Sequence, residues 1–264
     1  MPKNQKLNFS ELQKKARLRL LKMHYEAGVG HIGGNLSALD SMLYLYHYIL
    51  NEDDQYILSK GHAAGALYIT LWTLEKISEE ELLTFHKNAT KLAGHPAPNL
   101  IKDILFATGS LGHGLGIACG LALGNKLQNK NNRVFCLMSD GEWQEGSNWE
   151  SLIFLNHHQL DKLTIMVDCN GLQGFGSTLE VASMDVKKLK KLFSAFDFDI
   201  CEIDAHSEEE LKKSLLKESN KPQIILMNSC KGKGISFMEN QMQWHYLPLT
   251  EELYQKAKME IESL

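Results

Sequence analysis

Two short runs of almost purely apolar residues, VFCLM at 134–138 and LTIMV at 163–167, constrain the fold of this chain most strongly. The segment between them, 145–160, carries apolar residues at helical spacing. Strands that are apolar at nearly every position are buried on both faces, as in a parallel sheet covered by helices. We therefore expect an α/β fold with three layers, in which a mainly parallel sheet has helices on both faces.

The same alternation continues toward the carboxyl terminus. Strands are expected at 196–204 and 222–229, with a helix between them over 207–219. The sequence contains no internal repeat, no low-complexity segment and no convincing linker. We therefore expect one domain over residues 1–264.

The amino-terminal part of the chain is expected to be helical. Ser10 with Gln13 predicts a capping box for a first helix, which Gly28 should end. A glycine-rich loop should follow, and Ser37 and Asp40 are expected to open a second helix.

Composition and charge exclude several classes of protein. Hydrophobic residues make up 44% and charged residues 23%, which is ordinary for a soluble globular protein. A net charge of -4 leaves no basic surface for nucleic acid, and no apolar run approaches the roughly 20 residues that span a bilayer. The five cysteines occur singly, and the start of the sequence lacks the apolar segment of a secretory signal. We expect a cytoplasmic protein with reduced thiols and no membrane or nucleic-acid partner.

Each of the two apolar runs is followed by a polar turn. The first turn, SDGEWQEG, contains Asp140, and the second, CNGLQGFG, contains Asn170, which lies 30 residues after Asp140. One strand, helix and strand unit needs about this spacing, and its parallel strands bring both turns to the carboxyl edge of the sheet. Open α/β sheets bind ligands at that edge.

The residue types in these turns suit a metal ion with oxygen ligands. A carboxylate and an amide carbonyl are hard donors of the kind Mg²⁺ takes together with substrate phosphates. Gly141 and Gly171 allow the backbone to approach a ligand closely. Either turn alone is more often a plain turn, because these are among the commonest turn pairs. The combination at crossover spacing favours a metal that anchors a diphosphate.

At this point the sequence resembles a known family. SDGEWQEG with CNGLQ is similar to the thiamine diphosphate motif, and the whole chain resembles the N-terminal, diphosphate-binding part of transketolase. Further motifs match in order along the chain: GHIGGNLSALD, LSKGHAAGALY, AGHP, ATGSLGHGLGIACGLALG, and CKGKGISFMEN with the later WH. The expected fold is then the thiamine-diphosphate-binding fold.

The resemblance implies a set of site residues. Mg²⁺ would be bound by Asp140, the Asn170 side chain and the Leu172 carbonyl. The residues that would contact the diphosphate through backbone or imidazole groups are Gly109, Ser110, Leu111, Gly141, His62 and His245. His31, His95 and His245 would line a substrate channel, and Glu145 would lie in a carboxylate network at the contact between chains.

The resemblance also implies an activity and a partner. A transketolase transfers a two-carbon ketol unit from a ketose, often phosphorylated, to an aldose, using thiamine diphosphate and Mg²⁺. A full transketolase is far longer and supplies the activating glutamate from a second domain. This chain would therefore be the N-terminal subunit of a split enzyme. It would be active only in an α2β2 assembly with a separately encoded, pyrimidine-binding C-terminal subunit. The alternatives are the α subunit of a 2-oxo acid dehydrogenase and a non-catalytic scaffold with the same fold.

Other polar residues receive simpler interpretations. A zinc site is disfavoured, because the sequence has no HExxH motif and no paired cysteines. His47 lies among apolar helix residues and is expected to pack in the core, whereas Lys60 is expected to be solvated. Two residues depart from the family pattern, Ser139 in place of a glycine before Asp140 and Tyr246 after His245.

Overall fold

A computed structural model describes residues 7–98 and 100–264 of the chain. Its main sheet has five strands in the order β1-β2-β3-β7-β6, and every neighbouring pair is parallel. The strands are β1 (Gln55–Leu58), β2 (Val134–Ser139), β3 (Leu163–Cys169), β6 (Asp199–Asp204) and β7 (Gln223–Asn228). Every residue of β2 and β3 is buried, as their apolar sequences predicted.

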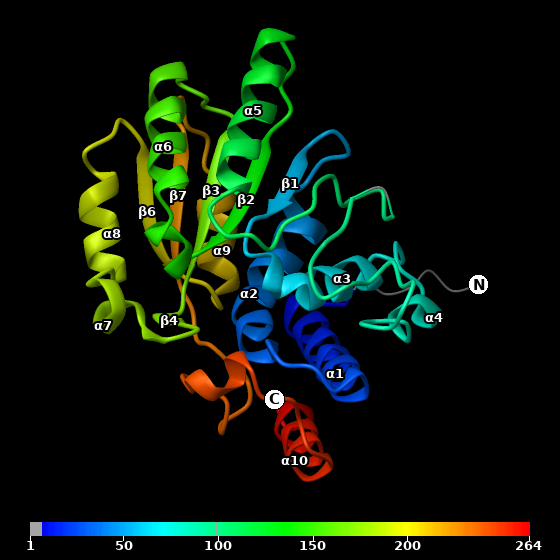
Figure 1. Ribbon diagram of the computed structural model, residues 1–264. Coiled ribbons are helices and arrows are strands. Elements are labelled where there is room, and N and C mark those ends of the chain that lie inside the picture. Colours follow the sequence, from blue (N-terminus) through cyan, green and yellow to red (C-terminus); the bar gives the residue numbers. More distant parts are fainter. Residues whose placement is uncertain (1–6, 99) are drawn as a thin grey trace.

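Helices cover both faces of the sheet (Figure 1). One face carries α5 (Gly114–Leu127), α6 (Gly146–His158) and α8 (Val186–Phe193). The other carries α1 (Phe9–Ala27), α2 (Ile32–Tyr44), α3 (Ala64–Thr73), α9 (Glu208–Leu215) and α10 (Glu251–Glu262). The short helices are α4 (Glu79–Leu82), α7 (Thr178–Ala182), the π-helix η1 (Leu45–Ile49), and the 3₁₀ turns η2 (Gly61–Ala63), η3 (Gly141–Gln144) and η4 (Met242–His245).

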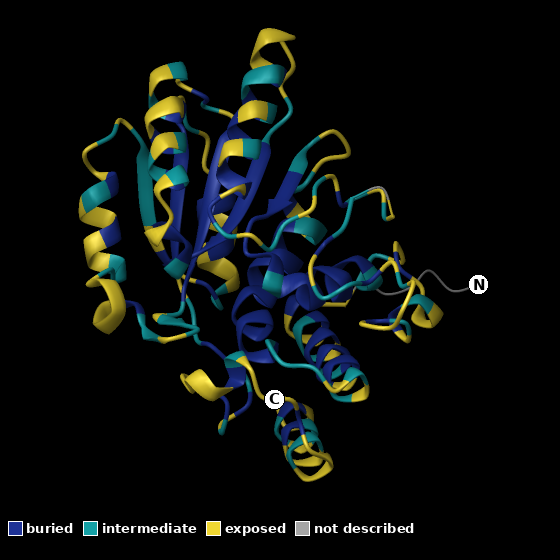
Figure 2. Cartoon of the chain, viewed as in Figure 1, coloured by how far each residue is buried: buried dark blue, intermediate teal, exposed yellow. Residues whose placement is uncertain are grey.

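Alternate side chains of the strands enter two separate apolar cores. In β2, Phe135 and Leu137 pack in the core with α1, α2 and α3, whereas Cys136 and Met138 pack in the core under α5, α6 and α8. This alternation follows from the period of two residues in a strand. The sheet is therefore the buried middle layer, and the outer faces of the helices are exposed (Figure 2). The expected three-layer α/β fold is confirmed.

Two predicted helix starts were wrong. Asn8 caps α1 and forms the capping box with Glu11, so Ser10 and Gln13 lie inside the helix. Helix α2 begins at Ile32, and Ser37 and Asp40 are buried inside it. Both polar side chains have distant partners, Asp168 for Ser37 and Arg17 for Asp40, which local sequence signals do not reveal. The expected end of α1 is confirmed, since Gly28 adopts a left-handed conformation with φ of 63°.

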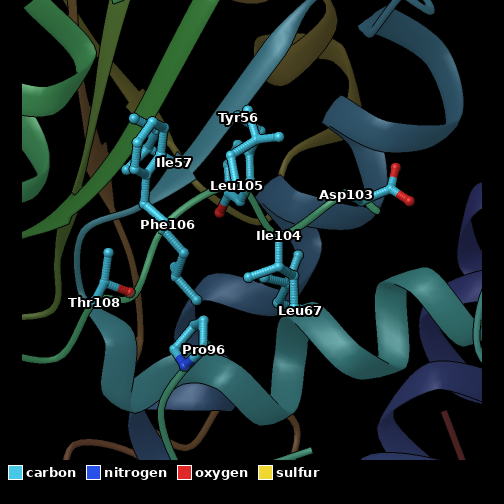
Figure 3. A pocket seen from close by; sticks show the side chains of 10 residues that line it. Tyr56, Ile57, Leu67, Pro96, Asp103, Ile104, Leu105, Phe106 and Thr108 are labelled. Carbon is cyan, nitrogen blue, oxygen red and sulfur yellow. The ribbon is translucent and has the colours of Figure 1, made fainter. Parts of the chain in front are cut away.

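A long loop after α4 is fixed against the edge strand before it reaches the carboxyl edge of the sheet. Figure 3 shows Ile104, Phe106 and Thr108 of this loop around a small pocket beside Ile57 of β1 and Leu67 of α3. The pocket has a volume of about 10 Å³, which is room for about one water molecule. The loop is thus closely packed where it leads into Gly109. Within the part of the chain that the structure describes, none of the helices has the length and apolar character needed to cross a membrane.

Candidate active site

The carboxyl ends of β1, β2, β3 and β7 surround a cleft of about 390 Å³. The short hairpin of β4 (Leu172–Gln173) and β5 (Gly176–Ser177) borders it, near the label β4 in Figure 1. Among the described residues, eleven of the twelve predicted from the sequence line this cleft: His31, His62, His95, Gly109, Leu111, Asp140, Gly141, Glu145, Asn170, Leu172 and His245. Ser110 is the member of the predicted set that does not line it. One cleft thus gathers residues from six segments of the chain.

Asp140 connects the two predicted turns directly. Its carboxylate accepts hydrogen bonds from the backbone amides of Gly141, at 2.8 Å, and of Gly171, at 2.6 Å. Gly171 belongs to the second turn and has φ of 72°, a conformation that favours glycine. The expected meeting of the two turns at one edge of the sheet is therefore observed.

The Asp140 carboxylate is buried without a neutralising partner. Burial, reinforced by the negative charge of Asp168, raises the pKa of Asp140 to about 6. Among the described residues, no cationic group lies within ion-pair distance of this carboxylate, whereas the neighbouring Asp168 pairs with Lys60. A buried carboxylate of this kind is suited to hold a cation.

The oxygens around Asp140 fit a hard metal ion. The Asn170 side-chain oxygen accepts a hydrogen bond from the Leu172 amide at 3.1 Å, which fixes that side chain in the turn. A carboxylate, an amide oxygen and a backbone carbonyl form a donor set typical of Mg²⁺. In residues 7–98 and 100–264, no group of three or more His, Cys, Asp or Glu side chains is placed to hold a metal ion. The predicted Mg²⁺ set contains only one such side chain, so it differs in kind from a zinc site.

Three of the predicted histidines form a cluster. The ring centroids of His31 and His245 are 5.0 Å apart, and His62 lies 5.7 Å from each. Burial is the main cause that lowers the pKa of all three, and nearby cationic lysines lower it further. The pKa of His245 falls to about 3. The imidazoles are therefore neutral near pH 7 and can both donate and accept hydrogen bonds.

Close backbone packing holds the remaining histidine, His95, against the glycine-rich segment. A Cβ atom at Gly109 would lie 2.5 Å from the His95 ring, and Gly109 has φ of 132°. A Cβ at Gly61, just before His62, would lie 2.6 Å from the Gly109 amide nitrogen. Glycine is required at both positions, because any side chain would separate these loops.

Lys60 was predicted to be solvated, and this was wrong. Its side chain is fully buried, pairs with the Asp168 carboxylate and donates to the Gly34 carbonyl at 3.2 Å. Burial would raise the pKa of Asp168, but the charge and hydrogen bond of Lys60 outweigh it and keep that pKa below its usual value. The sequence did hold a signal for this pair. An aspartate at the end of an apolar strand needs a buried partner, because an unpaired charge there is costly.

Two further residues of the site were not predicted. Lys231 is buried, lines the cleft, and its Nζ lies 3.0 Å from Nδ1 of His245. Burial and then the charge of Lys60 lower the pKa of Lys231 to about 8. Glu142 is buried beneath the cleft, where it accepts hydrogen bonds from Ser59 and from the Gly112 amide. Burial raises the pKa of Glu142.

Other expectations had mixed outcomes. His47 is only half-buried, in the π-helix η1, and its Nε2 lies 2.9 Å from the Thr73 hydroxyl. Glu145 is exposed at the rim of the cleft. The side chain of Tyr246 reaches the hairpin, where its hydroxyl donates to the Gly174 carbonyl at 3.3 Å.

A parallel sheet with this cleft at its carboxyl edge defines an α/β domain that binds an anionic cofactor. Residues 11–262 match the family described as "Transketolase, thiamine diphosphate binding domain", and the chain belongs to this family. It is 35% identical to one named subunit of the apulose-4-phosphate transketolase of Phocaeicola vulgatus, over 95% of this chain and 93% of that protein. It is 34% identical to the 6-deoxy-6-sulfo-D-fructose transketolase subunit SqwG of Clostridium sp., over 89% of each chain.

Longer relatives match over part of their length. Human transketolase is 34% identical over 99% of this chain, which corresponds to 43% of the human protein. The crystal structure of transketolase from Campylobacter jejuni superposes with a TM-score of 0.87 at 28% identity, over 98% of this chain and 43% of that one. The chain thus spans less than half the length of these transketolases but about nine-tenths or more of the length of the two relatives that are named as subunits.

Proposed function

We propose that this protein is the N-terminal subunit of a two-chain, transketolase-like transferase. It moves a two-carbon ketol unit from a ketose or ketose phosphate to an aldose acceptor, with thiamine diphosphate and Mg²⁺. The observation that carries the proposal is the single cleft in which Asp140 and Asn170 lie together with four histidines. The transketolase names of the relatives support the same reaction class.

In this proposal the two turns hold the metal and the diphosphate. Asp140, the Asn170 side chain and the Leu172 carbonyl are the metal ligands. The raised pKa of Asp140 supports this role, because a bound cation would offset the cost of the buried charge. Backbone groups of Gly109, Ser110, Leu111 and Gly141, with His62 and His245, contact the diphosphate. The buried ammonium of Lys231 adds positive charge on the same side of the cleft.

The neutral histidines serve the sugar. His31, His95 and His245 line the cleft and can donate to or accept from substrate hydroxyls. An imidazole can also take or return a hydroxyl proton as the carbon–carbon bond is broken or formed. Thiamine diphosphate, when bound, supplies the ring that stores the electrons of the broken bond. This chain supplies position, proton transfer and an anchor.

We further propose a separate C-terminal, pyrimidine-binding subunit, an α2β2 assembly and a cytoplasmic location. The chain has three arginines, Arg17, Arg19 and Arg133, and each pairs with a carboxylate away from the cleft. Arginines that bind a sugar phosphate bidentately would therefore come from a partner. The relatives of similar length that are named as subunits of transketolases support a two-chain arrangement. Glu145, exposed at the rim, is placed to meet that partner.

The test is reconstitution. The chain is used to capture its partner from the native host, and the purified pair is assayed against ketoses and aldoses with and without thiamine diphosphate and Mg²⁺. A partner of about 300 residues and metal-dependent ketol transfer are expected, at the domain size typical of such folds. A lipoyl-bearing partner would favour a 2-oxo acid dehydrogenase, and a pair without cofactor-dependent activity would favour a scaffold.

Variants connect the activity to the cleft. Asp140→Ala should abolish turnover in the reconstituted pair, because it removes the anionic metal ligand. Asp53→Ala is the matched control, since Asp53 is exposed far from the cleft residues in the loop before β1. Full Mg²⁺-dependent turnover of the Asp140 variant would overturn the assignment.

A further inference from the structure

A buried ionic cluster lies outside the cleft, among α1, α2 and the turn before α9. Asp40 of α2 accepts hydrogen bonds from Arg17 of α1, at 2.5 Å, and from Nδ1 of His206, at 2.7 Å. The side chains of all three are at most 11% exposed. Burial alone would raise the pKa of Asp40, but the charge of Arg17 and the hydrogen bond from His206 hold it below its usual value. Asp40 is therefore a carboxylate with two committed partners.

The other side of the His206 ring has a partner of the opposite kind. The backbone amide of Cys230 donates to Nε2 of His206 at 3.0 Å. An amide can only donate, so Nε2 carries no proton and the ring is neutral with its proton on Nδ1. That is the form that donates to Asp40. The two contacts together fix both the orientation and the tautomer of His206.

The segment that His206 holds leads into the cleft. Ser229 donates to the Asp168 carboxylate, and the Gly232 amide donates to the Gly33 carbonyl at 3.0 Å. Between these two attachments lie the amide of Cys230, bound by His206, and the side chain of Lys231. The Lys231 stem packs tightly on α2, since a Cβ at Gly33 would be 3.1 Å from Lys231 Cγ.

Lys231 in turn determines the state of a cleft histidine. Its Nζ lies 3.0 Å from Nδ1 of His245, and a protonated lysine can only donate there. The proton of the neutral His245 ring is then on Nε2, the nitrogen that faces Gly174 of the hairpin lining the cleft. A line of contacts thus runs from Arg17 through Asp40, His206, Cys230 and Lys231 to His245.

We propose that Asp40 and His206 are positioning residues for the cleft, which hold residues 229–232 so that Lys231 sets the tautomer of His245. Neither residue lines the cleft, so they act through the segment and not on a substrate. The use of this arrangement in catalysis rests on the proposed function, whereas the arrangement itself does not.

The test uses two variants that divide the contacts of His206. In His206→Gln the side-chain oxygen can still accept from Cys230, and in His206→Asn the shorter amide can still donate to Asp40 but does not reach Cys230. The full chain is labelled with ¹⁵N-histidine, the His245 signals are assigned with His245→Gln, and amide exchange is followed at Cys230. Circular dichroism selects variants that are folded.

The wild type and His206→Gln are expected to show the Nε2–H tautomer of His245 and a slowly exchanging Cys230 amide. His206→Asn should show about tenfold or more faster exchange at Cys230 and a mixture of His245 tautomers. A folded His206→Asn variant with wild-type exchange and an unchanged His245 spectrum would overturn the proposal. Equal loss in both variants would also overturn it, because it would indicate general destabilisation.

A second measurement separates this inference from the proposed function. Thiamine diphosphate with Mg²⁺ is titrated into each full chain together with its captured partner. His206→Asn should bind about tenfold more weakly and His206→Gln within about threefold of the wild type. A wild-type pair that binds no cofactor would count against the proposed function, and the NMR result would still decide the positioning role.

Discussion

Replacing Lys60 by methionine should destabilise the protein strongly, because the substitution leaves Asp168 charged and buried without a cation. The two side chains are 0% and 1% exposed, so solvent does not screen the pair. Asp168 would keep its hydrogen bonds from Ser37 and Ser229. Breaking a buried ion pair from one side costs about 3–5 kcal/mol. We expect a loss of this size at pH 7 in urea-induced unfolding.

A double variant and a control give the loss its physical cause. Lys60→Met combined with Asp168→Asn removes the orphaned charge as well, so the two substitutions should couple by roughly 1–3 kcal/mol in the stabilising direction. Lys130→Met is the matched control: Lys130 is exposed, and among the described residues no carboxylate pairs with it. Its free energy of unfolding should stay within about 0.5 kcal/mol of the wild type.

The pH dependence has a definite sign. In the wild type the pKa of Asp168 is below its usual value, so the stability from the pair is present above the unfolded pKa of about 4 and is lost as the pH falls through the folded pKa. Without Lys60, burial raises the pKa of Asp168, and protonation then relieves the unpaired charge. The deficit of the variant should therefore shrink between pH 7 and pH 5. A deficit under 1 kcal/mol at pH 7, or one that grows toward pH 5, would refute this reasoning.

Three further outcomes are expected. Asp140→Asn should abolish Mg²⁺-dependent ketol transfer and yet stabilise the free chain above pH 6 by up to about 3 kcal/mol, since the raised pKa of Asp140 means that its charge opposes folding there; urea unfolding at pH 5 and pH 7 measures this, and a less stable variant at pH 7 would be the contrary result. Gly171→Ala should cost about 1–2 kcal/mol because φ is 72° with nothing within 4 Å of the added Cβ, while the control Gly120→Ala in exposed, open space on α5 should gain about 0.5–1 kcal/mol; a neutral Gly171 variant in thermal unfolding would show that the turn relaxes. Thiamine diphosphate with Mg²⁺ should stabilise the lone chain little and the chain with its partner by about 2.7 kcal/mol at 100 times Kd; equal thermal shifts in the two samples would contradict a cofactor site shared between chains.

The sheet and the metal turns were predictable because they depend on short-range order along the chain. Apolar runs alternating with a helix determine a parallel sheet, and the crossover rule then brings Asp140 and Asn170 to one edge. The Gly171 amide bonded to the Asp140 carboxylate is the direct result. The histidine cluster came from the family resemblance and not from spacing, because His31 and His245 lie at opposite ends of the sequence.

The residues that were missed depend on tertiary packing. Helix α2 begins at Ile32 with two glycines in its first turn, a choice that helix propensity disfavours. Gly33 is needed there because a side chain would meet Lys231 and Trp244 at about 3 Å. In the same way, Lys60 and Lys231 are ordinary lysines in sequence, and only the folded chain shows the carboxylate and the imidazole that they contact.

Anomalous diffraction from crystals grown with thiamine diphosphate and Mn²⁺ in place of Mg²⁺ is the most direct measurement. One peak is expected between the ends of β2 and β3, with the Asp140 carboxylate, the Asn170 side-chain oxygen and the Leu172 carbonyl each about 2.1 Å away, as for a small hard cation. The same peak should contact the diphosphate. A metal bound elsewhere, or a diphosphate that does not contact it, would contradict the proposed site.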